Sequence, residues 1–170
     1  MKMFLLVLCI LSFSGFTSAH AAENWKGHTE TSPVEVGVVT GLSLFGTQAA
    51  WGSLITGAYL IKPNGLLDDV DNRVWVEMEA GPAFFTAPAG STGTAFQYST
   101  HLRWDFTYNE YWTAYALGGF SGYSLPAYLG KTFSFHPRFG VGVEYQTKTP
   151  LMFRGEVSAE FMGAGIALNF

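Results

Sequence analysis

Residues 131–146, KTFSFHPRFGVGVEYQ, alternate strictly between apolar and polar side chains. The large apolar residues from Phe133 to Tyr145 occupy odd positions, whereas His136, Arg138 and Glu144 occupy even positions. A two-residue period held this long indicates an extended strand with two different surroundings. Since an average strand has only about 5–6 residues, this one suits a membrane-spanning barrel with a lipid-facing exterior and a polar lumen.

The first 21 residues have the features of a secretory signal peptide. Lys2 gives a positive start, residues 3–13 are apolar, and Ala19-His20-Ala21 predicts cleavage after Ala21. The apolar run is shorter than the roughly 20 residues of a transmembrane helix, and no later segment approaches that length. Cys9, the only cysteine, lies inside the signal and lacks the small residues that precede a lipoprotein cysteine. We therefore expect neither disulfides nor thiolate metal sites in the mature chain.

Composition also favours an outer-membrane protein. Removing Lys2 with the signal leaves 8 basic against 13 acidic residues, a net charge of −5, which argues against a nucleic-acid partner. Charged residues make up only 13% of the chain, aromatic residues make up 16%, and there are 20 glycines. An exported chain of this kind without a helical span predicts a barrel, which satisfies every backbone hydrogen bond within the wall.

Residues 22–32 are polar and predict a periplasmic lead-in to a barrel over residues 33–170. Alternation predicts strands at 33–45, 50–61, 73–85, 94–108, 111–120 and 131–146, although 50–61 is apolar on both parities and leaves its register open. In 151–170 the apolar parity flips near Phe161. The flip means either a tight turn, giving eight strands, or a bulge, giving seven. Because single-chain bacterial barrels have even strand numbers, we predict a turn at 159–163 and an all-β, eight-stranded antiparallel up-and-down transmembrane β-barrel, as a monomer.

Loop lengths predict the orientation. The short connections at 109–110 and 147–150 suit the periplasmic side, and 86–93 and 121–130 then lie outside, while 62–72 is long for a periplasmic loop. Aromatic residues at the strand ends predict two interfacial girdles. They are Tyr108, Tyr111, Trp112 and Tyr145 on the periplasmic side, and Phe84, Phe85, Phe96 and Phe133 on the outer side.

The last 30 residues resemble a known family. GVGVEY at 140–145, a short turn and then Leu151-x-x-Arg154-x-Glu156 are similar to the penultimate hairpin of small OmpA-like, opacity-type outer-membrane barrels, and GIALNF at 165–170 is similar to their closing strand. The resemblance implies a place in the outer membrane of a Gram-negative-type cell, contact with its lipids, and recognition of the terminal Phe170 by the barrel-insertion machinery. The long outer loop that often carries adhesion or phage binding in that family is missing between the last two strands.

Charged side chains gather on the inward parity. The predicted lumen cluster comprises Glu77, Glu79, His101, Arg103, Asp105, His136, Arg138, Glu144, Arg154 and Glu156. Turn positions set Glu77 opposite about Arg103 and Glu79 opposite about His101, and bring Glu144 close to Arg154 and Glu156. An eight-stranded barrel is just wide enough for its side chains to fill it. We therefore expect a salt-bridged plug, with a narrow channel or porin-like conduit as the alternative.

A lipid A-modifying acyl hydrolase is a further alternative. It requires a nucleophile, a base and an orienting acid within hydrogen-bond reach. Ser134 and His136 are the nearest candidates, but the acid on their strand, Glu144, lies about 26 Å away at roughly 3.3 Å per residue. A soluble lipid carrier with an apolar interior is disfavoured by the aromatic strand ends and Phe170. We predict a structural or surface-interaction role, without catalytic residues, cofactors or metal ligands.

Overall fold

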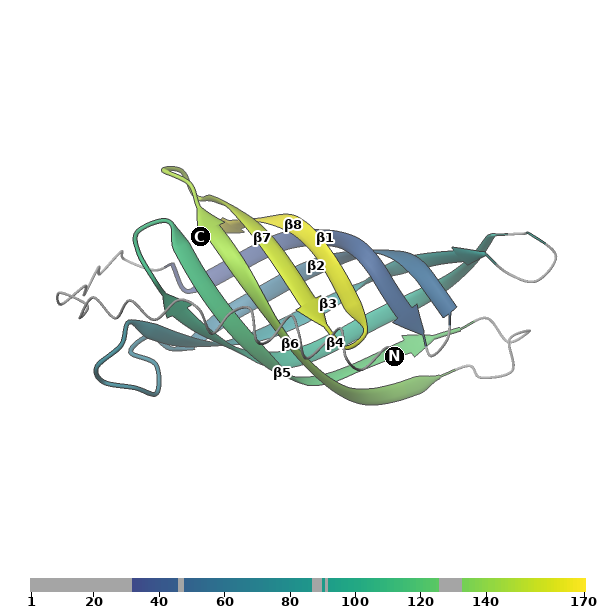
Figure 1. Ribbon diagram of the computed structural model, residues 1–170, viewed down its shortest axis with the longest axis horizontal. Coiled ribbons are helices and arrows are strands. Elements are labelled where there is room, and N and C mark those ends of the chain that lie inside the picture. Colours follow the sequence, from purple (N-terminus) through teal and green to yellow (C-terminus); the bar gives the residue numbers. More distant parts are fainter. Residues whose placement is uncertain (1–31, 46–47, 87–89, 91, 126–132) are drawn as a thin grey trace, which may run out of the picture.

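The computed structural model describes residues 32–45, 48–86, 90, 92–125 and 133–170, which form a closed antiparallel barrel (Figure 1). The predicted signal peptide and nearly all of the predicted lead-in lie outside these residues. Each strand pairs with its neighbours in sequence, and β1 closes the wall by pairing with β8. The strands are β1 (Val34–Phe45), β2 (Gln48–Lys62), β3 (Asn72–Thr86), β4 (Thr92–Thr107), β5 (Trp112–Ser124), β6 (Ser134–Gln146), β7 (Leu151–Ser158) and β8 (Phe161–Asn169).

Two ambiguities in the sequence are resolved. The chain turns between Ser158 and Phe161, so the parity flip is a turn and the barrel has eight strands, as predicted. In β2 the odd positions face outward: Ile55 is 66% exposed and Leu54 only 1%. Because both parities of β2 are apolar, only the pairing with its neighbours fixes which set faces the lipid.

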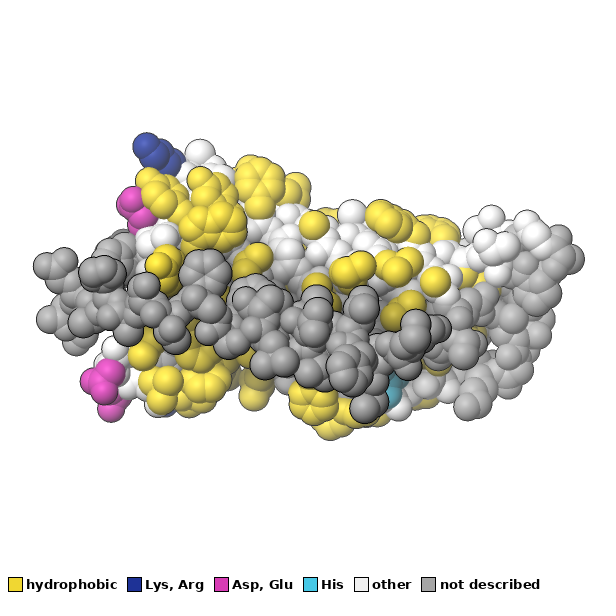
Figure 2. Space-filling model, viewed as in Figure 1, with side chains coloured by type: hydrophobic (Ala, Val, Ile, Leu, Met, Phe, Trp, Pro, Cys, Tyr) yellow, Lys and Arg dark blue, Asp and Glu magenta, His cyan; other side chains and the backbone are white. Residues whose placement is uncertain are grey.

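The exterior of the barrel is apolar over most strands. Outward residues such as Met78, Leu102, Phe139 and Val141 are more than half exposed, and Figure 2 shows apolar side chains along the wall. No helix in the described part of the chain is long and apolar enough to cross a bilayer. A closed wall with an apolar exterior satisfies its backbone internally and is the architecture of a membrane-spanning barrel.

Exposed aromatic residues lie at both ends of the barrel, as the expected girdles require, except at one position. Trp112 and Tyr145 pack with their ring centroids 4.9 Å apart at one end of the barrel. At the other end Phe84 is 44% exposed, but Phe85 is 4% exposed and packs among Ala50, Ala83 and Ala95 inside. The prediction for Phe85 was wrong because neighbouring residues of a strand face opposite sides of the wall.

The wall has unequal heights at its two ends. The β3–β4 ladder extends to Thr86↔Thr92, whereas the ladder between β6 and β7 begins only at Gly140↔Ser158, and Figure 1 shows the short β7–β8 hairpin. Ala159 donates its backbone N–H to the Phe139 carbonyl over 3.2 Å. Pro137 lies two residues before Phe139 in β6, so the backbone edge of Pro137 also points toward β7, which has already ended at this level. Proline fits there because its missing N–H has no ladder partner to lose.

Candidate functional site: the charge network of the lumen

Three arginines fill the middle of the lumen. Arg103, Arg138 and Arg154 extend from inward positions of β4, β6 and β7 and are at most 2% exposed. Each guanidinium has five donors in a rigid planar arrangement, so one side chain can bind several carboxylates at once. The arginines therefore connect strands that are not neighbours in the wall.

Arg103 binds carboxylates from β1, β3, β4 and β6. Its Nη2 lies 2.7 Å from Glu35, its Nε 2.9 Å from Asp105, and its Nη1 2.9 Å from Glu144 and 3.3 Å from Glu77. All five side chains are buried. Arg103 donates charge-assisted hydrogen bonds to Glu35, Glu77 and Asp105 and forms an ion pair with Glu144, so it connects four strands.

Arg138 and Arg154 continue the same network. Arg154 forms ion pairs with Glu77 and, over 2.8 Å, with Glu156, while Arg138 forms ion pairs with Glu79 and the other oxygen of Glu156. Glu156 thus bridges these two arginines, and Glu77 bridges Arg154 to Arg103. The three guanidiniums and their carboxylates form one connected unit.

Aromatic rings line this unit. The Arg154 Nε donates to the Tyr115 hydroxyl over 2.8 Å, and its guanidinium lies 4.9 Å from the Tyr115 ring centroid. The Arg103 guanidinium lies 5.1 Å from the Trp75 ring and 5.4 Å from Tyr115. These cation–π contacts are favourable in a desolvated site and fill the space that the ion pairs leave.

The structure brings most of the predicted cluster together. Eight predicted residues belong to the network: Glu77, Glu79, Arg103, Asp105, Arg138, Glu144, Arg154 and Glu156. The imidazole of His101 borders it, with Nε2 3.5 Å from Glu77. His136 is half-buried near the start of β6 and contacts the network only through Glu160, which lies 3.9 Å from Arg138.

The predicted register of the β3–β4 hairpin was wrong by two residues. Glu77 faces His101, and Arg103 faces Trp75. The ladder closes at Thr86↔Thr92, so each residue of β3 faces a β4 residue two positions earlier than predicted. In β6–β7 the predicted pairing of Glu144 with Arg154 is confirmed, yet Glu144 forms its ion pair with Arg103.

Several network residues were missed as partners. Glu35 lies on the inward face of β1, and its contact with Arg103 joins residues 68 positions apart. Tyr115 and Ser99 gave no distinctive signal, although Ser99 donates to Glu79 over 3.0 Å. Closure of the barrel brings Glu35 to Arg103, whereas Ser99 lies directly opposite Glu79 in the β3–β4 ladder.

A second polar cluster lies beside the β7–β8 turn, where Glu160 Oε1 is 3.9 Å from Arg138 Nε. Glu160, from the β7–β8 turn, lies 2.7 Å from His136 Nε2, and the Ser121 hydroxyl lies 3.4 Å from the same nitrogen. The acid close to His136, which β6 itself does not provide, therefore comes from the β7–β8 turn. A catalytic triad places its acid and its nucleophile on opposite ring nitrogens. Here both contact Nε2, so the three side chains do not form a relay.

Comparisons with known proteins give similarity of fold alone. No family model and no curated protein matches the chain. Among solved structures, Ail, the attachment invasion locus protein of Yersinia pestis, in complex with the heparin analogue sucrose octasulfate, aligns with a TM-score of 0.49 and 14% identity over 81% of this chain and 94% of that chain. The Ail structure in a phospholipid bilayer nanodisc gives 0.48 and 15% over 80% and 99%. These values assign no role to any residue.

Proposed function

We propose that the chain is a structural barrel of the outer membrane whose lumen is closed by its charge network. The observation that carries this is the burial of Arg103, Arg138 and Glu77, each 0% exposed. Side chains that water cannot reach do not line an open conduit. Contacts with partners then involve the outer rim and the lipid-facing wall, which is the surface-interaction role expected from the sequence.

Bilayer conductance tests this proposal. Refolded protein in a planar bilayer should give no current steps, because moving the plug would break several buried ion pairs at about 3–5 kcal/mol each. Arg138→Ala removes one arginine from the middle of the plug and should produce flickering leak currents. Arg73→Ala is the matched control, since Arg73 pairs only loosely with Asp71 over 3.9 Å and both are partly exposed. Steady current steps from the unmodified protein would favour a channel.

We infer that the barrel carries out no turnover chemistry. Ser121, His136 and Glu160 contain the residue types of an acyl hydrolase, but the shared nitrogen leaves Glu160 unable to orient a base for Ser121. Mass spectrometry of lipid A from cells with and without the protein should show identical species. Acyl-chain loss that disappears in Ser121→Ala would establish the hydrolase instead.

We further propose that the C-terminal strand is recognised by the barrel-insertion machinery and that the barrel acts as a monomer. Phe170 supports this, because it is 63% exposed while its backbone N–H is fixed on the Val34 carbonyl over 2.9 Å. Phe170→Ala should reduce the amount of folded, heat-modifiable protein in outer membranes while leaving refolding in detergent unchanged. Equal loss in both settings would indicate a folding defect rather than a recognition defect.

A further inference from the structure

Carboxylates outnumber arginines inside the barrel. Among the described residues seven carboxylates are buried, Glu35, Glu77, Glu79, Asp105, Glu144, Glu156 and Glu160, against three arginines, Arg103, Arg138 and Arg154. Four negative charges are left without a guanidinium of their own, and two even if both His101 and His136 are protonated. Burial of uncompensated charge is costly. Additional positive charge, beyond that of the three arginines, would therefore stabilise the interior.

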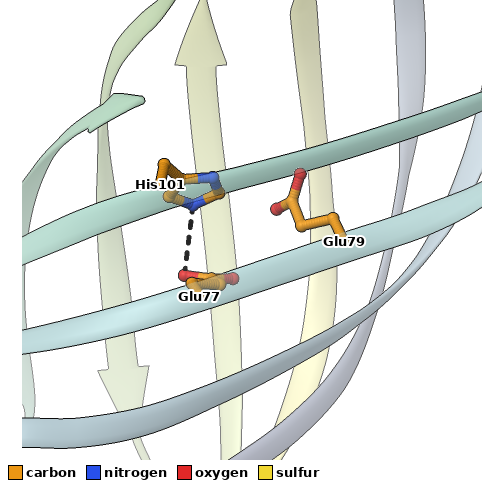
Figure 3. Close-up of side chains that lie close together, drawn as sticks. All are labelled: Glu77, Glu79 and His101. Atoms are coloured by element: carbon orange, nitrogen blue, oxygen red, sulfur yellow. Dashed lines mark ion pairs between the residues drawn. The ribbon is translucent and has the colours of Figure 1, made fainter. Parts of the chain in front are cut away.

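Two of these carboxylates converge with a histidine. Glu77 and Glu79 are two residues apart on the inward face of β3, and His101 faces Glu77 from β4. Figure 3 shows the three side chains directed toward one another. Each offers one atom that could bind a metal, and these three atoms all lie within 4.8 Å of one another. His101 Nε2 is 3.5 Å from Glu77 Oε2, close to the roughly 3.4 Å that separates two ligands of a tetrahedral zinc ion with bonds of about 2.0–2.2 Å.

The cluster contains polar atoms without hydrogen bonds. Both ring nitrogens of His101 and Oε1 of Glu79 have no hydrogen-bond partner within the described structure, although the two residues are only 3% and 2% exposed. Buried side-chain donors and acceptors are normally satisfied. The nearest charged groups, Glu77 at 3.5 Å from His101 and Arg154 at 3.8 Å from Glu79 Oε1, form no hydrogen bond with these atoms, and a bound ion would give them a bonded partner.

The remaining carboxylate oxygens are already held in place. Glu79 Oε2 accepts hydrogen bonds from Ser99 and Arg138, and Glu77 Oε1 accepts one from Arg154. Such outer partners orient the ligands of protein metal sites. Arg154 approaches Glu79 Oε1 to 3.8 Å, and Arg103 Nη1 donates a hydrogen bond to Glu77 Oε2 over 3.3 Å. A metal ion must therefore bind these oxygens strongly enough to compete with both guanidinium groups.

We propose that Glu77, Glu79 and His101 bind one divalent transition-metal cation of the Zn²⁺ class in the barrel core. One imidazole and two carboxylates are ligands that zinc accepts, and its charge offsets two of the four excess negative charges. Because the lumen is closed, the ion enters as the chain folds. The site fixes β3 to β4 and is structural.

Metal content after refolding tests the proposal. Untagged protein is unfolded with chelator, refolded in detergent with Zn²⁺, passed through gel filtration, and analysed by elemental mass spectrometry. We expect about one zinc per chain and a higher unfolding temperature than in protein refolded with chelator. His101→Gln should lose the zinc. His136→Gln is the matched control and should retain it, since the His136–Glu160 pair is the competing site beside the β7–β8 turn.

Co²⁺ keeps the test decisive if His101→Gln does not fold. Unmodified protein refolded with Co²⁺ should show visible absorption bands of a four- or five-coordinate ion with nitrogen and oxygen ligands. Absence of stoichiometric metal in both experiments overturns the proposal and assigns the balancing charge to protons. Loss of metal in His136→Gln with retention in His101→Gln also overturns it. Neither result depends on whether the barrel conducts.

Discussion

The lumen is filled in two different ways. Across β3, β4, β6, β7 and the start of β1, where Glu35 lies, it contains arginines and carboxylates. Further along β1, at the seam with β8 and β2, it contains Val39, Leu54 and Phe161, each 1% exposed. In both regions the side chains extend from inward-facing positions of the strands and are almost completely shielded from water. The charged region depends on directional bonds whose loss exposes partners, while the apolar patch depends on volume and shape.

Glycines allow the strands to approach closely in both regions, and the apolar seam is one example. At the apolar seam, a Cβ added to Gly165 would lie 2.0 Å from the Val38 carbonyl oxygen, so only glycine fits there. Glycine opposite Val39 lets that side chain pack against the wall itself. In the charged region long side chains also cross the lumen, so Arg103 reaches Glu35 and Glu144 on strands that do not border β4.

The largest effect is expected from Arg154→Ala. The substitution leaves Glu77 and Glu156 with less compensation in a dry interior, which should lower the free energy of unfolding by about 3–5 kcal/mol. Urea unfolding from vesicles, followed by gel mobility, measures it. In a double-mutant cycle, adding Glu156→Gln should restore part of the loss. Additive effects of the two changes, or an unchanged midpoint, would show that the pair is not a unit.

A somewhat smaller effect is expected from Leu54→Ala in the apolar patch. Removing a buried leucine side chain should cost about 3 kcal/mol, from lost burial and the cavity left behind. The neighbouring Ile55→Ala is the matched control, because Ile55 faces the lipid and lipid can fill the space. Leu54→Ala should also add to Arg154→Ala, since the two sites share no partner. Equal losses at positions 54 and 55 would contradict the assignment of faces.

The strands and their faces could be predicted because alternation is local. The run around Phe139 and Val143 indicates a strand without knowledge of any other residue, and the turn near Phe161 follows from a parity flip. Adjacent pairing across a short turn, as for Glu144 and Arg154, also follows from counting. Where the turn is longer, one residue of error moves every pair by two, as it did for Glu77.

The ion-pair partners could not be predicted because they depend on closure. Arg103 reaches Glu35 and Glu144 across the lumen, and nothing in their sequence separation indicates that contact. Glu160 was missed because it lies in a turn, where alternation does not indicate which way a side chain points. It becomes a partner of His136 only because the β7–β8 hairpin is short and its turn lies beside the first residues of β6.

Tyr115→Phe tests the contact between the aromatic lining and the charged region. The Tyr115 hydroxyl accepts from Arg154 Nε over 2.8 Å, and its removal leaves that donor unsatisfied while keeping the ring. We expect a loss of about 2 kcal/mol, as for a hydrogen bond to a charged group. In the Arg154→Ala background the same change should cost little. An equal cost in both backgrounds would assign the role of Tyr115 to packing.

The smallest effect is expected at the border between the two regions. Ser43, which faces Phe161 in the β1–β8 ladder, donates its hydroxyl to Gln97 across the lumen over 2.8 Å. Ser43→Ala should lower stability by about 1 kcal/mol, because the Gln97 carbonyl loses a buried donor. The control is Ser53→Ala on the outer wall, where Thr40 retains its bond to the Gly52 carbonyl over 3.0 Å; its cost should stay below roughly 0.5 kcal/mol. If the two substitutions lower the free energy of unfolding equally, the Ser43–Gln97 hydrogen bond adds no stability beyond the packing around it. The apolar patch and the charged region would then be held together by packing alone.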